Sequence, residues 1–164
     1  LCSSGRIQNA NGWRRYGACP VWRVMAKETG VNKSDSLFHS QNGGCFRPGM
    51  GVWAFPTFCF SVGTLDAPVI TGAVREGWSV TLNWENDIDR PKAGNSDRVY
   101  VGYFYDTEPR APQMLSCWGA CRGDGTVTVD IPSAGQPDGT RLHLYLFFGN
   151  EMSNRFSPSG YVEV

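Results

Sequence analysis

Alternation of apolar and polar residues in the C-terminal part of the chain restricts its fold more than any other feature. Val80, Leu82 and Trp84 alternate with polar residues, which places the three apolar side chains on one face of an extended strand. Segment 98–105 repeats the pattern with apolar residues on both faces, so both faces should be at least partly covered. A period of two predicts β-strands, because a buried helix face has a period near 3.6.

Similar segments recur along the chain with turn residues between them. The predicted strands are 52–55, 58–62, 80–85, 98–105, 126–131, 141–148 and 161–164. Pro56 places the junction of the first two at an edge or bend. Glycine- and proline-rich turns, such as 123–125 and 137–139, separate the later ones. About seven strands joined by such turns suit a Greek-key sandwich. We therefore expect a mainly β fold, with an antiparallel sandwich of the immunoglobulin or fibronectin type III kind over residues 61–164.

The first part of the sequence has a different character, with glycine and asparagine scattered among aromatic residues. A short helix is predicted near 20–29, with a proline in its first turn and an apolar stripe along one side. A second helix containing Leu37 and Phe38 should end at the Asn-Gly-Gly of 42–44. Both are short, so we expect residues 1–60 to form an irregular, partly helical docking segment.

Several segments taken in order resemble a known family. They are 62–65 (VGTL), 80–86 (VTLNWEN), 99–101 (VYV) with Tyr105, 123–127 (GDGTV), 142–148 (LHLYLFF) and 153–154 (SN). In this order they are similar to the C-terminal module of uncharacterised Bacteroidetes proteins that are known only as a domain of unknown function. The resemblance covers about 61–164 and implies the same sandwich fold, and it assigns no catalytic residue. Residues 1–60 depart from the family's usual start, particularly in their tryptophans and cysteines.

Charge and hydropathy restrict the partners. Fifteen basic and fifteen acidic residues leave no net charge, whereas proteins that bind phosphate backbones usually carry a clustered basic surplus. We therefore expect no nucleic-acid partner. The sequence contains no apolar run of about 18 residues, so no membrane span is expected. The chain starts at Leu1 rather than methionine, so a missing leader does not indicate the cytoplasm. An extracellular, cell-surface or virion location is favoured.

Six cysteines form an even set: Cys2, Cys19, Cys45, Cys59, Cys117 and Cys121. In an exported protein they would suit disulfides, with fifteen connectivities open, whereas in a reducing compartment several would be buried thiols. Cys117 and Cys121 could begin a zinc site, but zinc needs four ligands and no second Cys or His cluster has suitable spacing. A local disulfide or two unrelated thiols explains this pair more simply, and we expect no metal or cofactor.

Three further patterns have simple structural explanations. Arg122-Gly123-Asp124 is the tripeptide that integrins recognise on loops, but Gly-Asp-Gly is also ordinary turn chemistry. The acids Glu85, Asp87 and Asp89 could ligate calcium, yet a charged, solvated loop fits them better. His39 and His143 are the two histidines available to a hydrolase, and neither lies in a nucleophile motif. We therefore expect no enzymatic activity.

Six tryptophans are many for this length, and exposed ones could stack on sugar rings or anchor a protein interface. Trp84 should lie in the core. Trp78 and Trp118, with Tyr100 and Tyr145, are the candidate binding residues. The function expected is a non-enzymatic structural or adhesive module of a bacterial surface or phage particle, acting through a protein partner or self-assembly. The alternative is a carbohydrate-binding module that takes a glycan on these aromatic residues. An enzyme of unrecognised type is the third hypothesis.

Overall fold

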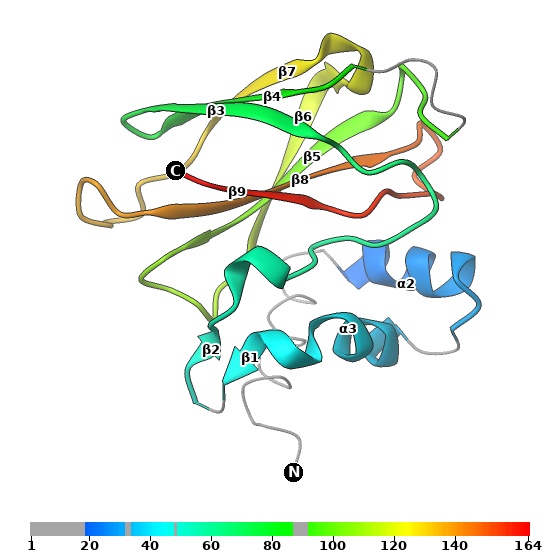
Figure 1. Ribbon diagram of the computed structural model, residues 1–164, viewed down its shortest axis with the longest axis horizontal. Helices are drawn as coiled ribbons and strands as arrows, with labels where there is room; N and C mark the ends of the chain where they lie inside the picture. Colours follow the sequence, from blue (N-terminus) through cyan, green and yellow to red (C-terminus); the bar gives the residue numbers. More distant parts are fainter. Residues whose placement is uncertain (1–18, 32–33, 48, 87–91) are drawn as a thin grey trace.

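The alternating segments pair into two antiparallel sheets that face each other, and a helical layer covers the far side of one of them (Figure 1). The computed structural model describes residues 19–31, 34–47, 49–86 and 92–164. The sheets have the strand orders β3-β4-β7 and β6-β5-β8-β9. Their strands are β3 (Ile70–Glu76), β4 (Ser79–Trp84), β5 (Arg98–Tyr105), β6 (Gln113–Cys121), β7 (Thr126–Asp130), β8 (Leu142–Gly149) and β9 (Gly160–Glu163). The expected antiparallel β-sandwich is therefore confirmed.

Mostly aliphatic side chains fill the space between the two sheets, with a few aromatic ones such as Trp84 and Phe148. β8 contributes Leu142, Leu144 and Leu146, each with no exposed surface, and they meet Val80 and Leu82 of β4. The remaining strands add alternate residues, as the period of two predicts: Val99, Val101, Tyr103, Tyr105, Val127, Val129 and Ile131. Trp84 is buried here too, and its indole nitrogen donates to the Arg122 carbonyl at 2.9 Å. Its predicted place in the core is thus confirmed.

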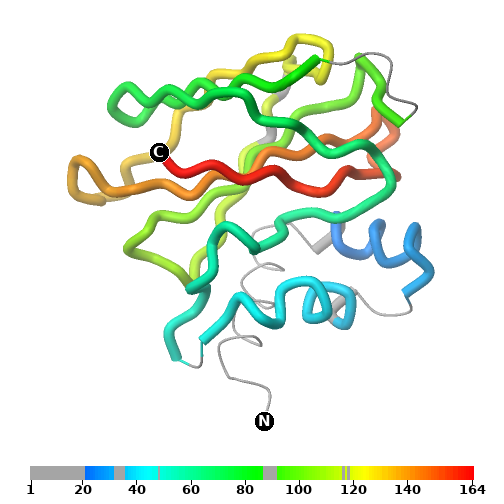
Figure 2. The backbone as a smooth tube through the Cα atoms, viewed as in Figure 1, coloured from blue at the N-terminus to red at the C-terminus, as the bar shows by residue number. Residues whose placement is uncertain are grey.

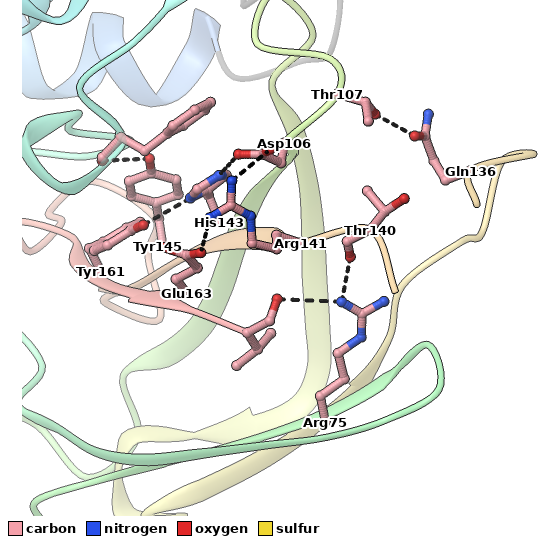
Figure 3. Close-up of polar contacts among 12 residues, drawn as sticks. Arg75, Asp106, Thr107, Gln136, Thr140, Arg141, His143, Tyr145, Tyr161 and Glu163 are labelled. Carbon is pink, nitrogen blue, oxygen red and sulfur yellow. Dashed lines mark hydrogen bonds and ion pairs between the residues drawn. The ribbon is translucent and has the colours of Figure 1, made fainter. Parts of the chain in front are cut away.

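Arg75 of β3 links the two sheets at one edge of the sandwich (Figure 3). One guanidinium nitrogen donates to the carbonyls of Thr140 at 2.6 Å and Val164 at 3.4 Å. Its Nε donates to the carbonyl of Gly77 at 2.7 Å, in the turn between β3 and β4. The Arg75 side chain thus joins β3 of one sheet to the segment before β8 and to the residue after β9 in the other sheet.

Residues 19–60 form the helical layer, which we call the cover (Figures 1 and 2). Its elements are α2 (Cys19–Glu28), α3 (Ser34–Asn42), the 3₁₀ turns η1 (Gly43–Cys45) and η2 (Phe55–Thr57), and the short strands β1 (Phe46–Arg47) and β2 (Gly51–Val52). Gly30 follows α2 in the turn that stops the helix; its φ of +76° favours glycine, and Val31 donates back to the Ala26 carbonyl at 2.8 Å. Both predicted helices are confirmed. Among the described helices, none is long and apolar enough to cross a bilayer.

The cover packs against the outer face of the four-stranded sheet through aromatic rings. Phe58 and Phe60 from the cover contact Phe104 of β5 and Tyr145 of β8 edge-on or tilted, with ring centroids 4.8–5.6 Å apart. Phe60 lies directly over Gly102, where a Cβ would come within 2.3 Å of its ring. Tyr145 adds a hydrogen bond from its hydroxyl to the Phe55 carbonyl at 2.7 Å. β8 is therefore buried on both faces along its whole length.

Two of the predicted strands are wrong, and two observed ones were not predicted. Segments 52–55 and 58–62 are not sandwich strands: β2 ends at Val52, and Pro56 lies in a 3₁₀ turn. The apolar rings of this region bury against the sheet without joining it. β3 and β6 do join the sandwich, although β3 alternates weakly and β6 has an irregular register.

Candidate functional site

A polar cluster lies where the cover meets the outer face of the four-stranded sheet (Figure 3). His143 of β8 places Nε2 2.8 Å from Asp106 Oδ1 and Nδ1 2.8 Å from the Tyr161 hydroxyl. Phe55 of the cover stacks flat on the imidazole, with 3.7 Å between ring centroids and 2° between planes. His143 is consequently 4% exposed, and three separate segments of the chain fix its position.

Charged groups surround this histidine on its solvent side. The exposed Arg141 donates to Asp106 Oδ2 and to Glu163 Oε1, both at 3.2 Å. The hydrogen bond from His143 lowers the pKa of Asp106, with further help from Arg141. Burial raises the pKa of Tyr161 to about 12, and the nearby Glu163 and Asp106 carboxylates contribute to the shift.

The raised pKa of Tyr161 does not favour its use as a nucleophile or base. A tyrosine nucleophile or base needs a lowered pKa, whereas Tyr161 is held neutral. Phe55 also covers one face of the imidazole. The cluster instead joins β5, β8 and β9 to the cover. His39, the other candidate, lies on α3 beside Phe38.

The Arg122-Gly123-Asp124 tripeptide is a structural 3₁₀ turn, η3 (Arg122–Asp124), between β6 and β7. Arg122 is 6% exposed and its Nε lies 2.9 Å from Asp97 Oδ2. Its guanidinium also covers the Phe148 ring at 4.0 Å and donates to the Asp66 carbonyl at 2.9 Å. An arginine fixed in this way cannot reach a receptor. The tripeptide therefore serves as an ordinary structural turn, as its sequence suggested.

The edge strand β6 contains a wide bulge that brings several candidate residues together. β5 and β6 pair at Arg98↔Cys121 and again at Tyr100↔Ser116. Between these pairs β5 contributes Val99 alone, whereas β6 contributes residues 117–120. Gly119, with φ of +91°, permits the sharp turn of the backbone. The extra residues move this stretch away from the sheet plane, which is how bulges redirect side chains at functional edges.

A hollow of about 460 Å³ lies beside the bulge. Its lining includes Ser96, Arg98, Tyr100, Ala120, Glu151 and Ser153. The wall that carries Glu151 and Ser153 is a tight turn in which the Asn150 side chain accepts the backbone N–H of Asn154 at 2.9 Å. Met152, between these wall residues, is 79% exposed. The hollow thus offers an aromatic ring and both signs of charge, and one of its walls is a hydrogen-bonded turn that contains the exposed Met152.

Four cysteines in the described part of the chain carry free thiols: Cys45, Cys59, Cys117 and Cys121. Burial raises the pKa of Cys117 to about 11, so this thiol is unreactive near neutral pH. Burial also raises the pKa values of Cys45 and Cys59. Cys2 lies outside the described residues, and Cys19 begins α2. The disulfide question therefore stays a prediction.

The candidate metal sites find no support among the residues that the structure describes. Within those ranges, no three His, Cys, Asp or Glu side chains gather closely enough to hold an ion. Cys117 and Cys121 lie at opposite ends of the bulge. Glu85 is exposed after β4, while Asp87 and Asp89 lie outside the described residues.

The four aromatic candidates do not form one platform. Tyr145 has no exposed surface and lies under the cover, so its predicted role in a surface site is wrong. Trp78 is half-buried against Tyr105, with Arg75 over its ring at 4.8 Å. Tyr105 ends β5, whereas the bulge lies opposite Val99 near its start, which separates Trp78 from Trp118. Tyr100 lines the hollow, in the strand opposite the bulge, and the side chain of Trp118 lies outside what the structure describes.

The strand order defines the class of the protein. A sheet β3-β4-β7 packed on a sheet β6-β5-β8-β9 is a fibronectin type III-like sandwich. A crystal structure of chicken CNTN1 FN1-FN3 domains matches 62% of this chain and 32% of its own, with 12% identity and a TM-score of 0.44. The FN3 domain of human collagen XX matches 63% of this chain and 95% of its own, with 13% identity and a TM-score of 0.42.

An enzyme is also among the similar structures. The beta-1,2-glucanase from Parabacteroides distasonis matches 63% of this chain but only 13% of its own, with 18% identity and a TM-score of 0.39. Likenesses at this level carry no functional argument. No protein-family model matches the chain, and no curated protein sequence matches it.

Sequence reasoning missed the two features that shape this surface. The bulge had only one visible signal, a glycine between Trp118 and Ala120 in an otherwise strand-like run. The burial of Tyr145 follows from Phe55, Phe58 and Phe60, which were assigned to strands. An unusually aromatic segment ahead of a sandwich is a signal that could have indicated a cover.

Proposed function

We propose that the chain is a non-enzymatic protein-interaction module that binds a partner at the bulged edge of β6. The fibronectin type III-like sandwich is consistent with such a role. The observation that carries the proposal is the hollow itself, where Tyr100, Arg98 and Glu151 lie beside the exposed Met152. Aromatic residues, methionine and arginine are enriched at protein interfaces.

The cover influences which surface serves this role. The predicted docking segment packs, over its described residues, on its own sandwich, and it occupies the outer face of the four-stranded sheet. The hollow at the bulged edge adjoins this buried face, since its Tyr100 stacks on Phe147, yet it stays open to solvent. The placement of the module on a bacterial surface or phage particle, in a Bacteroidetes family, belongs to the same proposal and rests on the resemblance of residues 61–164.

The test is a selection of displayed random peptides on the immobilised full chain. Selected peptides are then measured against Ser96→Trp, which fills the hollow from an exposed position on its wall. Ser133→Trp is the matched control, because Ser133 is an exposed serine that does not line the hollow. Binding that falls at least about tenfold in Ser96→Trp alone supports the proposal. Binding that is equal in both variants overturns it. Light scattering on the same samples detects self-assembly.

A glycan site is the second candidate, and the place of Tyr100 in the hollow favours it. Sugar-binding sites combine an aromatic surface with charged hydrogen-bonding groups, and Arg98 and Glu151 would supply the latter. Tyr100 stacks one ring face on Phe147, at 5.2 Å and 11°, which leaves only its other face for a sugar. A glycan array probed with wild type and Ser96→Trp separates this candidate from the first, since only a glycan site binds an array member in a hollow-dependent way.

A further inference from the structure

The outer edge of β7 presents backbone groups that the β-sandwich does not pair. Hydrogen bonds from Trp84 N to Gly125 O and from Ile131 N to Trp78 O, at 3.0 and 2.8 Å, fix the ladder between β4 and β7. With the register Val80↔Val129, alternate residues of β7 bond to β4. The N–H and C=O groups of Thr126, Thr128 and Asp130 therefore point away from the sheet. β7 is the last strand of its sheet, so these groups face outward.

The neighbouring edge strands are protected in ways that β7 is not. β6 carries the bulge of residues 117–120, which interrupts a straight row of donors and acceptors. β3 has a register irregularity between Ile70 and Gly72. β7 is regular over its whole length and pairs residue for residue with β4. Regular unprotected edges are the surfaces on which extended peptides add.

A groove of about 590 Å³ runs along this edge between β7 and β6. Every residue of β7 lines it, and the opposite wall includes Leu115, Cys117 and Ala120 of β6. An added strand would have space for its inward-facing side chains against this mostly apolar wall. The connection between β6 and β7 is only the short η3 turn, and no strand of the described residues pairs with this edge of β7.

The charges of the groove favour a foreign peptide over a second copy of the chain as its occupant. Among the described residues, its lining includes two carboxylates, Asp124 and Asp130, and no lysine or arginine. In a symmetric antiparallel pairing of two copies, Thr128 would face Thr128 and four carboxylates would come together at one interface. Such an arrangement is repulsive, whereas a foreign peptide with basic ends would place a cation near each carboxylate.

We propose that β7 accepts an extended peptide of a partner protein as an added strand, with small or β-branched residues in the groove and a lysine or arginine near each end. This inference goes beyond the proposed function, because the groove along β7 is a second site that shares only Cys117, Gly119 and Ala120 with the hollow beside Tyr100. Up to six backbone hydrogen bonds join the peptide to Thr126, Thr128 and Asp130, and side-chain contacts at every second position provide specificity.

The test uses the full chain and a labelled peptide in which valine and threonine alternate between terminal lysines. Fluorescence anisotropy gives its affinity, and amide exchange locates its site. Two N-methyl groups on the amides that face β7 should weaken binding by at least about tenfold, while the same groups on the opposite amides should leave it within about twofold. Equal effects of the two methylation patterns overturn the proposal, and this arm leaves the protein unchanged.

Protein variants supply the second arm. Thr128→Pro removes an outward N–H at an edge position that tolerates proline, and Thr128→Val is its matched control with the N–H kept. We expect loss of peptide binding in the first and retention in the second. Asp130→Lys should weaken the lysine-ended peptide about threefold to fivefold at low salt and strengthen a glutamate-ended one. An unchanged preference overturns the charge assignment.

The peptide-binding results distinguish a failure of strand addition from a failure of the proposed interaction function. A peptide that binds in the Thr128→Pro variant but not in Ser96→Trp uses the hollow, which overturns strand addition and keeps the interaction module. A chain that binds no peptide in either experiment and binds a glycan overturns both. Protection of the amides of Thr126, Thr128 and Asp130 on binding supports strand addition.

Discussion

The two faces of the four-stranded sheet are buried by different means. On β8 the inner face carries Leu142, Leu144 and Leu146, which meet the opposite sheet of the same sandwich. The outer face carries His143, Tyr145 and Phe147, which meet the cover. Regular strands on one side favour aliphatic residues that interdigitate, whereas the irregular cover fits broad rings that can pack edge-on at many angles. The same strand therefore serves two cores of different composition.

A charged pair of side chains lies beside each of these two cores, and the two pairs differ in exposure. Arg122 and Asp97 form an ion pair beside the inner core, with side chains 7% and 8% exposed. His143 and Asp106 lie at the margin of the outer core, where the Asp106 side chain is 34% exposed. Removing one partner of an enclosed pair leaves a charge without solvent, so a substitution that breaks the inner pair should destabilise the fold more than one that breaks the outer pair.

Removal of residues 1–60 should have the largest effect, because it exposes Phe104, Tyr145 and Phe147 together. We expect the remaining chain to aggregate, as measured by its soluble fraction and by light scattering. Threonine at these three positions in the shortened chain should restore a soluble monomer. A shortened chain that stays monomeric without these changes would show that the outer face does not need the cover.

Arg122→Met should be the most damaging single substitution, at about 3–5 kcal/mol of unfolding free energy, because Asp97 is left buried without its partner. Adding Asp97→Asn should recover part of the loss. His143→Phe should cost only about 1–2 kcal/mol, since Asp106 keeps Arg141 and solvent. Urea unfolding of the three variants measures the difference, and equal losses would contradict the contrast between the two faces.

Gly102→Ala tests the fit of the cover, since its Cβ would lie 2.3 Å from the Phe60 ring. We expect a loss of about 1–3 kcal/mol, as for other overpacked cores. Gly72→Ala is the matched control in a strand of the other sheet, where the nearest atom is 3.7 Å away. Combining Gly102→Ala with Phe60→Leu should cost less than the sum of the single changes.

Alkaline pH should give the smallest effect. Tyr161 has a pKa of about 12 in the folded chain, above its ordinary value, so the unfolded chain loses this proton first. Its contribution to stability is complete below about pH 10 and disappears as the pH rises toward 12. Tyr161→Phe should therefore lose less melting temperature over this interval than wild type. Parallel curves would show that the tyrosine is not held neutral by folding.

The inner core could be predicted from the sequence because each strand carries its own period of two. The alternation of Val80, Leu82 and Trp84 with polar residues identifies the buried face of this strand from the segment alone. The outer core could not, since the side chains of Tyr145 and Phe147 look surface-facing until the cover is placed over them. The surface site at the bulge could not be predicted for the same reason. A local sequence pattern does not show that four residues of β6 lie opposite one residue of β5.

The bond between Tyr145 and Phe55 joins residues 90 positions apart, which has a consequence for synthesis on the ribosome. The cover is translated before the sheet face on which it rests. At a synthesis rate of about 5–20 residues per second, roughly 5–18 s pass between the synthesis of Phe55 and that of Tyr145. During that interval Phe58 and Phe60 have no sheet to pack against. Nascent chains of this protein are therefore expected to depend on chaperones that shield N-terminal aromatic segments.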